Sequence, residues 1–484
     1  MIPSLHTGPI GFSRSEQYLA EIAQRTFLSF WSHPNLFRSL SKELADLIVI
    51  FGDDIVVFSD KSCEYRDGEH GWSRWYRRAI LDSAQQLHRA AGWLRKYPNR
   101  IYMDAKCERR FPLHVPASPR IHLVAVATGA RKAAERHFGG DGSLILHTHT
   151  SGTEKFIVGD LDRSKDIIHV FDDFSLSIVL AELDTAFDFI TYLQKRAAFL
   201  RSGPEIYANS EFDLLAYYLQ GTNGHEHDFI TPEPDPAVRL IAIEGYWNDF
   251  VSSGAYQRKK IANEDSYVWD RIIEDVAHHT AQGTLETGQE NGLAGNEKLL
   301  RFLAAENRFS RRQLGRALLG IRRLGATSLE NTHTRTVLGG NVTTRTYVFC
   351  VVRRDADTAD DYRGTRKAIL WTRMLITKLR NPDLRLIIGI GVGPADDPNQ
   401  SVELMVREFA DPWAPEEREE AEHLCDDLGI SRKPMGVKTV FLDQEFPPNP
   451  RTPGSRLARS RARAARKAAK EKRKVQRIAR KRNQ

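Results

Sequence analysis

The N-terminal region contains two short apolar runs that lie between two stretches of helical periodicity. Residues 42–51 and 55–61 are rich in Ile and Val and are bounded by turn-forming segments, as buried strands are. Residues 52–54, Gly-Asp-Asp, predict a hairpin turn between the two strands. Apolar residues at helical spacing predict one helix before this hairpin, at 15–31, and another after it, at 72–95.

Strand and helix patterns continue to alternate up to residue 202. Four further strands are predicted at 121–127, 143–147, 156–158 and 167–171. A long amphipathic helix then carries apolar residues at helical spacing: Leu183, Phe187, Ile190, Leu193 and Phe199. This alternation predicts an α/β domain with a mixed sheet over residues 11–202.

Two further units are predicted downstream. Breaks at 232–236, rich in Pro, and at 283–296, rich in Gly and polar residues, interrupt a mainly helical region at 206–330. An α+β domain follows at 342–445. Its predicted elements are strands at 347–352, 384–390, 402–406 and 437–441 and helices at 362–379 and 415–428.

Candidate chemistry lies at the ends of the two N-terminal strands. Asp46 is near the start of the first strand, and Asp60 and Lys61 end the second. Neighbouring strand ends lie close together, so these side chains are expected to converge. Carboxylate oxygens hold a hard divalent cation, and a nearby lysine can assist the attacking water. The pattern therefore indicates phosphodiester hydrolysis with Mg²⁺ or Mn²⁺, bound by Asp46 and Asp60.

The order of these residues resembles the PD-(D/E)XK nuclease superfamily, in particular its Mrr-like and nuclease-related branch. That family has a helix with a Glu, a strand with an Asp, a strand with (D/E)-x-K and a helix with a Gln. Glu16, Asp46, Lys61 and Gln86 match these positions. Ser59 stands where the family prefers an acid, so Asp60 would have to supply the second carboxylate through a bulge or an altered register.

The resemblance covers about the first 100 residues and implies a restriction-endonuclease-like domain. It implies that Glu16 helps to hold the water network and that Gln86 orients its neighbours. The expected function is that of a metal-dependent nucleic-acid phosphodiesterase, a DNA endonuclease of a defence or repair type. Because short motifs of this kind arise often by chance, Asp46 and residues 59–61 can also be ordinary polar strand ends.

The departure at Ser59 leaves a second function open, that of a non-catalytic nucleic-acid-binding protein with a degenerate nuclease fold. A third alternative is an assembly protein whose basic tail serves only solubility. Salt-sensitive DNA binding that depends on residues 451–484 would argue against this third alternative.

The net charge of +7 conceals a strongly basic C-terminal tail. Residues 451–484 hold 15 Lys or Arg and one acid, Glu471, whereas the rest of the chain is net acidic. Such a tail, disordered or conditionally helical, is typical of sequence-independent binding to DNA or RNA, and its alternative is a solvated tail without a partner. The candidate contacts are Arg459, Arg461, Arg463, Arg466, Lys467, Lys472, Arg473 and Lys474.

A second basic feature lies in the helix after the hairpin. At helical spacing Arg74, Arg77 and Arg78 lie on one side, and Trp72 and Trp75 on the other. Arginines beside the candidate site would suit a phosphate backbone. An aromatic core face with a solvated basic face explains the pattern equally well.

The remaining sequence features limit the range of functions. No apolar run approaches the ~18 residues of a membrane span, and the four cysteines form no CxxC pair. We therefore expect a cytoplasmic protein with free thiols and no membrane partner. The glycines of 389–393 continue an apolar strand and predict no nucleotide loop.

Overall fold

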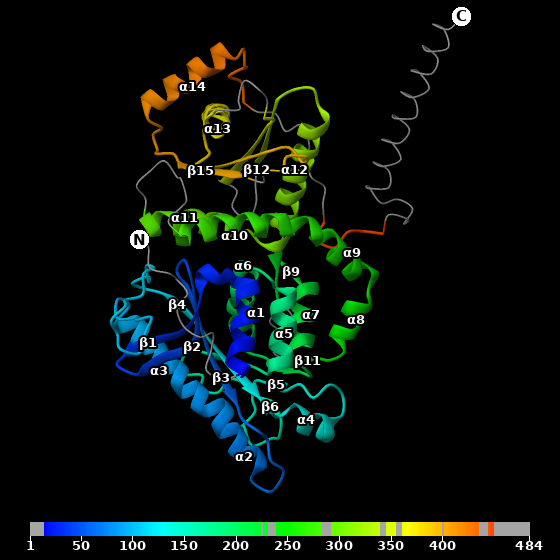
Figure 1. The fold of residues 1–484 in the computed structure, drawn as a ribbon. Helices are drawn as coiled ribbons and strands as arrows, with labels where there is room; N and C mark the ends of the chain where they lie inside the picture. Colours follow the sequence, from blue (N-terminus) through cyan, green and yellow to red (C-terminus); the bar gives the residue numbers. More distant parts are fainter. Residues whose placement is uncertain are drawn as a thin grey trace, which may run out of the picture.

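The computed structural model describes residues 14–223, 226–230, 239–282, 292–338, 345–354, 361–398, 401–434 and 444–449. Its fold is mixed α/β. Figure 1 shows an N-terminal part below and a C-terminal sheet above, with two helices, α10 and α11, crossing the molecule between them. In this described part no helix is both long and apolar enough to span a bilayer.

The N-terminal sheet has the strand order β1-β2-β3-β4-β7. β1, β2 and β3 form an antiparallel meander, and β4 and β7 continue parallel to β3. Gly52, with a φ of +64°, makes the tight turn between β2 and β3. The strands are β1 (Ser32–Ser39), β2 (Lys42–Phe51), β3 (Asp54–Ser62), β4 (Arg120–Thr128) and β7 (Ile168–Phe171).

Helices cover both faces of this sheet because its strands alternate two buried sets of side chains. Phe58 belongs to the set that packs with α1 (Arg14–Trp31), where its ring lies 6.2 Å from that of Phe27. Val57 belongs to the opposite set, which packs with Leu87 of α3 (Asp82–Lys96). The predicted hairpin and the helix at 15–31 are therefore confirmed.

The helix predicted at 72–95 forms as three consecutive segments: α2 (Gly71–Tyr76), a π-helical turn (Arg77–Leu81) and α3. Sequence patterns missed β1, whose Pro34 and Arg38 interrupt any apolar run. β1 is an edge strand of its sheet, a position that tolerates proline. The backbone at Tyr102 pairs with Phe37 and covers part of this edge.

A second sheet, with the order β11-β8-β5-β6, crosses the domain boundary predicted at 202–206. The helix expected around Leu183 to Phe199 forms as α6, which begins only after its N-cap Thr185, whereas Leu183 is the C-cap of the separate helix α5. The elements are α4 (Arg131–Phe138), β5 (Ile145–His147), β6 (Ile157–Val158), α5 (Asp173–Glu182), α6 (Ala186–Leu200), β8 (Glu205–Ala208), α7 (Glu211–Gln220), β9 (Thr222–Asn223), β10 (Glu226–His227) and β11 (Leu240–Ile243).

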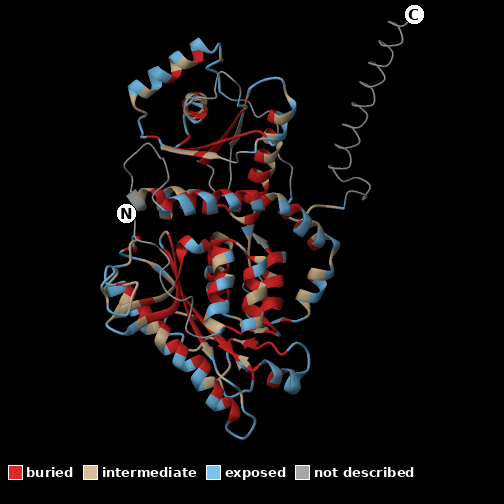
Figure 2. Ribbon diagram, in the orientation of Figure 1, coloured by how far each residue is buried: buried red, intermediate tan, exposed pale blue. Residues whose placement is uncertain are grey.

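The helical region separates the two parts and supports the C-terminal sheet, whose order is β12-β13-β14-β15. The helices are α8 (Tyr246–Ser252), α9 (Gly254–Asn263), a 3-10 turn (Glu264–Ser266), α10 (Tyr267–Gln282), α11 (Gly292–Ala304) and α12 (Arg308–Thr327). β12 (Thr332–Leu338), β13 (Arg345–Val352), α13 (Tyr362–Arg380), β14 (Leu386–Val392), β15 (Val402–Glu408) and α14 (Pro415–Asp427) follow. The central strands β13 and β14 are buried, and Figure 2 shows the outer side of α14 exposed.

In the C-terminal unit, Gly389 and Gly391 lie inside β14, as predicted. Other predictions lie outside the described residues: the break at 232–236, most of the break at 283–296, the strand at 437–441 and the tail at 451–484 with its eight candidate contacts.

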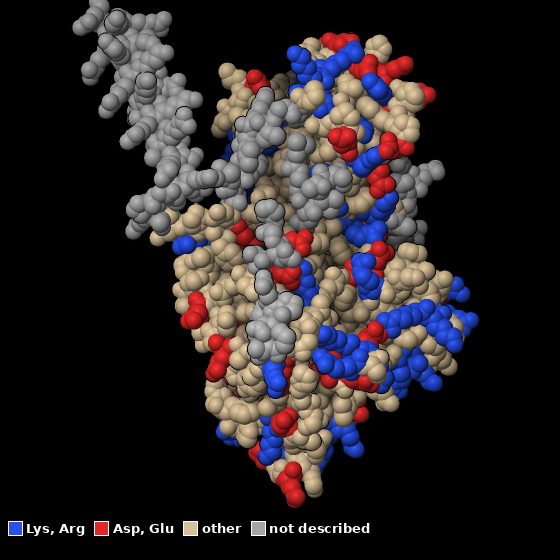
Figure 3. Space-filling model, turned by 180° about the vertical axis from the view of Figure 1, so that it is seen from behind, with Lys and Arg blue, Asp and Glu red and all other residues tan. Residues whose placement is uncertain are grey.

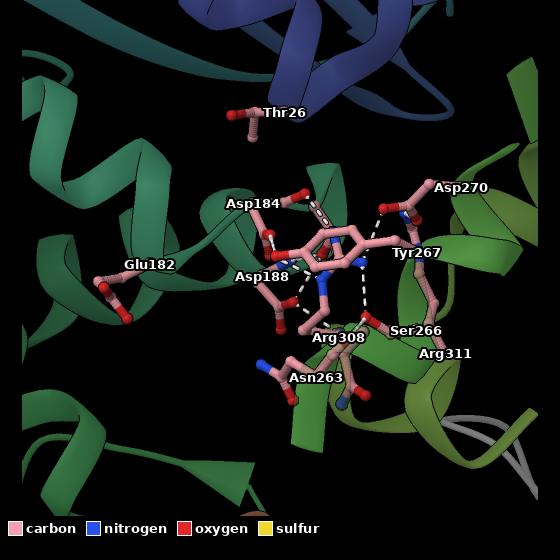
Figure 4. A network of polar contacts seen from close by, with 12 residues as sticks. Thr26, Glu182, Asp184, Asp188, Asn263, Ser266, Tyr267, Asp270, Arg308 and Arg311 are labelled. Carbon is pink, nitrogen blue, oxygen red and sulfur yellow. Dashed lines mark hydrogen bonds and ion pairs between the residues drawn. The ribbon is translucent and has the colours of Figure 1, made fainter. Parts of the chain in front are cut away.

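Two buried arginines and two partly buried aspartates join the N-terminal part to the helical region, and we call Asp184, Asp270, Arg308 and Arg311 the junction cluster (Figure 4). Arg308 contacts both carboxylates at 2.7 Å, and Arg311 contacts the second oxygen of Asp270 at 2.6 Å. Two guanidinium groups therefore balance two carboxylates between the α5–α6 turn, α10 and α12.

The last described segment, Gln444 to Asn449, is held against the same junction. Lys259 of α9 pairs with the Glu445 carboxylate at 2.8 Å, and His227 pairs with it at 2.7 Å. Arg312 donates hydrogen bonds to the carbonyl oxygens of Gln444 and Glu445. This segment is thus fixed by side chains from both the N-terminal part and the helical region.

Candidate active site at the ends of β2 and β3

The backbone pairing of β2 with β3 ends beside Asp46, and we call the place where the two strands separate the β2–β3 opening. This pairing extends from the turn to Leu47 and Phe58. Beyond that pair, the backbone N–H of Asp60 donates a 2.6 Å hydrogen bond to Oδ2 of Asp46. A side-chain carboxylate has therefore replaced a backbone carbonyl as the acceptor, and this exchange fixes the position of Asp46 at the opening.

Three of the predicted site residues meet at this carboxylate. Nε2 of Gln86, from the second turn of α3, donates to Oδ1 of Asp46 at 3.3 Å. Nζ of Lys61 lies 3.9 Å from Oδ2. Asp46 is only 7% exposed, whereas the Lys61 side chain is 34% exposed and can reach a ligand from solvent.

Ser59 occupies the position where the resembled family prefers an acid. It follows the last β2–β3 pair and lies on the same face as Lys61, toward α3. Its Oγ donates a 3.3 Å hydrogen bond to Oε1 of Gln86 and lies 3.4 Å from Oγ of Ser83. A hydroxyl group that holds the helix glutamine thus stands in place of a second carboxylate.

Asp60 does not replace the acid at position 59, as the bulge hypothesis required. The pairing of β3 with β4 is continuous through Asp60 to the end of the strand, so side chains alternate regularly. Asp60 therefore faces α1, on the opposite side of the sheet from Ser59 and Lys61. Its two oxygens are buried without a hydrogen bond of standard geometry; burial raises its pKa to about 6, and the nearby Ser15 hydroxyl opposes this rise.

Sequence reasoning missed Glu43, a further acid at this site. The register of β1 with β2 shifts between Leu36 and Phe37, so Leu44 is an extra residue between Glu43 and the rest of β2. Burial raises the pKa of Glu43 to about 7, and the charges of Asp46 and Glu16 add to the effect. Its Oε1 is buried without a hydrogen bond. The only sequence clue was an acid at the start of a predicted strand.

Negative charge is in excess at this end of the sheet, where Glu16, Glu43, Asp46 and Asp60 form what we call the acidic cluster. Glu16, from the first turn of α1, raises the pKa of the other three by its charge. Burial is the main cause of the raised pKa of Asp46, and Lys61 is the cation that opposes it. A bound cation would relieve this repulsion.

The fit of a divalent metal depends on which carboxylates can share it. Among the described residues, no three His, Cys, Asp or Glu side chains are grouped to hold a metal ion. Asp46 and Asp60 face opposite sides of the sheet and do not form the predicted pair. Asp46 and Glu43 fit better because Oε1 of Glu43 is a buried acceptor without a donor, and Mg²⁺ commonly uses one or two carboxylates plus substrate phosphate oxygens.

The three predicted arginines of the following helix have exposed side chains, and the aromatic face is buried as expected. Nε1 of Trp75 donates to the carbonyl oxygen of Cys63, just past β3, at 2.9 Å. Burial raises the pKa of the Cys63 thiol, and the charges of Arg78 and Lys61 oppose this rise. Arg78 therefore lies near the same end of β3 as Lys61, while Arg74 and Arg77 extend the exposed basic face.

No family model, curated protein or solved structure matches this chain. The assignment of the site therefore depends on the geometry and charge of its own residues.

Proposed function

We propose that this protein is a metal-dependent nucleic-acid phosphodiesterase, a DNA endonuclease whose site is centred on Asp46 and Lys61. The observation that carries the proposal is the Lys61 ammonium group, 3.9 Å from a buried Asp46 carboxylate within an excess of acidic groups. A carboxylate that can bind a metal ion and an ammonium group that can bind a phosphate would then act side by side at the β2–β3 opening.

The topology supports the same proposal. A helix, an antiparallel meander, a second helix and a strand parallel to the third occur in the order α1, β1-β2-β3, α3, β4. The resemblance to PD-(D/E)XK nucleases implies only a helix, two strands and a second helix in this order; α1, β2, β3 and α3 follow it, with Asp46, Lys61 and Gln86 on the expected elements. The basic tail supports a nucleic-acid substrate through its charge.

Each side chain has a distinct role in this proposal. Asp46 and Glu43 would hold Mg²⁺ or Mn²⁺, which supplies an activated water and neutralises charge on the phosphate. The ammonium group of Lys61 binds a phosphoryl oxygen and stabilises the charge that develops there. Gln86 orients Asp46, and Ser59 in turn positions Gln86 through its hydrogen bond.

Cleavage of supercoiled plasmid with Mg²⁺ or Mn²⁺ tests this assignment. We expect Asp46→Asn and Lys61→Met to lower the cleavage rate by about 100-fold or more, and Glu43→Gln to lower it as well. Asp60→Asn is the matched control, since its side chain faces α1, and should retain cleavage. No cleavage by the unsubstituted protein would refute the proposal, and loss of cleavage in Asp60→Asn alone would refute the assignment of Glu43.

One observation favours a second function, that of a non-catalytic nucleic-acid-binding protein on the same fold. The position facing the opening holds Ser59, whose hydroxyl is occupied by Gln86. DNA binding that is unaffected by Asp46→Asn and Lys61→Met, together with no cleavage in either metal, would establish this function instead.

A further inference from the structure

Three basic side chains surround two aromatic rings where α3 ends beside β1. The guanidinium of Arg38 lies 5.8 Å from the ring centroid of Trp93. Nζ of Lys96 and the guanidinium of Arg100 each lie 5.2 Å from the ring centroid of Tyr97. The two rings are themselves in contact, with centroids 4.7 Å apart. We call these five residues the basic–aromatic surface.

The cations of this surface lack the carboxylate partners that nearby cations have. Arg95 pairs with Asp166 at 2.7 Å and Arg120 with Asp54 at 2.6 Å. By contrast, Arg38, Lys96 and Arg100 form no ion pair with any carboxylate in the described part of the chain. Seen from behind, Lys and Arg gather densely on this side of the N-terminal part, at the right in Figure 3.

The basic surface extends toward the candidate active site. The backbone N–H of Ser41 donates to the carbonyl oxygen of Ala105, which holds the loop after α3 against the β1–β2 turn. Lys106 and Arg110 of this loop are exposed, as is Lys42, the residue before Glu43. Exposed cations therefore continue from the end of α3 to the start of β2, where the acidic cluster begins.

The three cations of this surface repel each other. Their contacts with the rings offset only part of the free energy of this repulsion, about 0.5–1 kcal/mol for each exposed cation–π contact. A polyanion would recover more, because each phosphate contact also releases condensed counterions. The rings are half-buried and already in contact with the cations. A bound nucleic acid would therefore contact the charged groups of this surface, and its bases would not stack on the rings.

We propose that the basic–aromatic surface docks the phosphate backbone of nucleic acid and leads it toward the β2–β3 opening. The proposal rests on the proposed function for the class of partner, but it does not require cleavage.

The test is the salt dependence of DNA binding by the full chain in EDTA, measured by fluorescence anisotropy with labelled duplex and single strands. The variant is Arg38→Gln/Lys96→Gln/Arg100→Gln. The matched control is Lys298→Gln/Arg418→Gln/Arg432→Gln, which removes three exposed cations that are paired with Glu408 or Glu422. Both variants lose the same charge, and both leave Asp46, Lys61 and the tail unchanged.

We expect the surface variant to lower the slope of log K against log salt concentration by about 2 to 3 on duplex DNA, and the control to change it by less than about 1. Equal slopes for the two variants would overturn the proposal, as would a loss of binding to anionic lipid vesicles with unchanged binding to DNA. A lowered slope in a protein that never cleaves DNA would support the docking surface and refute only the catalytic proposal.

Discussion

Two partly buried clusters in this protein combine carboxylates with basic side chains but are balanced differently. In the junction cluster, Arg308 and Arg311 contact Asp184 and Asp270 at 2.6–2.7 Å. In the acidic cluster, the charge of Lys61 opposes the raised pKa values of Glu43, Asp46 and Asp60, and its ammonium nitrogen lies 3.9 Å from Asp46. One arrangement satisfies its charges within the fold, and the other leaves them in excess.

The difference separates a structural role from a ligand-binding one. Buried ions are tolerated when partners and hydrogen bonds offset the loss of water, as they do around Arg308. Carboxylates with raised pKa values cost stability that the fold itself does not recover, and such groups concentrate at functional sites. The comparison therefore indicates that the junction cluster holds the two parts together, and it supports the proposal that Asp46 and Glu43 of the acidic cluster bind a cation.

The largest effect on stability is expected from removing an arginine of the junction cluster. Arg308→Met removes the guanidinium that contacts both Asp184 and Asp270, and should lower the free energy of unfolding by about 3–5 kcal/mol. Denaturant unfolding measures this loss. Arg323→Met, on the exposed side of the same helix, is the control and should change stability by less than about 0.5 kcal/mol. Equal small effects of the two variants would contradict the structural role of the junction cluster.

A smaller effect on stability is expected when the acidic cluster gains another carboxylate. Ser59→Asp places a buried acid beside Asp46 and should cost about 2 kcal/mol of unfolding free energy in EDTA. Millimolar Mg²⁺ should recover most of this loss, since a ligand at about 100 times its Kd adds about 2.7 kcal/mol.

Ser59→Asn has nearly the same shape without the charge, so it keeps only Asp46 and Glu43 as ligands and should be stabilised less by Mg²⁺ than Ser59→Asp is. If Mg²⁺ stabilises neither variant, the place where β2 and β3 separate is not a cation site.

The smallest effect concerns pH. The native pKa of Glu43 is raised from 4.5 to about 7, so the native protein binds its proton more tightly than the unfolded chain does. The stability that this tighter proton binding contributes is fully present below pH 4.5 and is lost as pH rises through about 7. Glu43→Gln mimics the protonated form and, since Glu43 is partly exposed, should stabilise the protein by about 1 kcal/mol at pH 8 in EDTA and by little at pH 4.5.

Unfolding curves at the two pH values measure this difference, with the exposed Glu419→Gln as the control. A pH-independent effect of Glu43→Gln would show that the acidic cluster does not perturb this carboxyl group.

Local patterns predicted those parts of the fold that depend on neighbouring residues. The apolar runs on either side of Gly52 were recognised as a hairpin because period and turn chemistry are local. β1 was missed because Pro34 and Arg38 interrupt its apolar pattern, although its partner β2 follows directly, and because its contact with Tyr102 depends on a distant residue. The boundary expected after residue 202 is crossed by β8, whose partner β5 lies far away in the sequence.

The same dependence on contacts between distant residues explains which parts of the candidate site were predicted and which were not. Asp46, Lys61 and Gln86 were predicted from their order along the chain, and the fold brings them together. The direction of Asp60 depends on the register of β3 with β4, which no motif specifies. Glu43 joins the site through a register shift between β1 and β2 and through its burial, so its perturbed pKa was not predictable from residue type.

The clamp on Gln444 to Asn449 has a consequence for everything that follows it in the chain. Lys259, His227 and Arg312 fix this segment to the body, so the next residue starts from a defined point rather than from a mobile end. If the basic residues after 450 bind a polyanion as proposed, the point of contact lies at most about 3.5 Å per intervening residue from Asn449. The effective concentration of such a polyanion at the body of the protein would then be set by the length and stiffness of the linking chain and not by dilution.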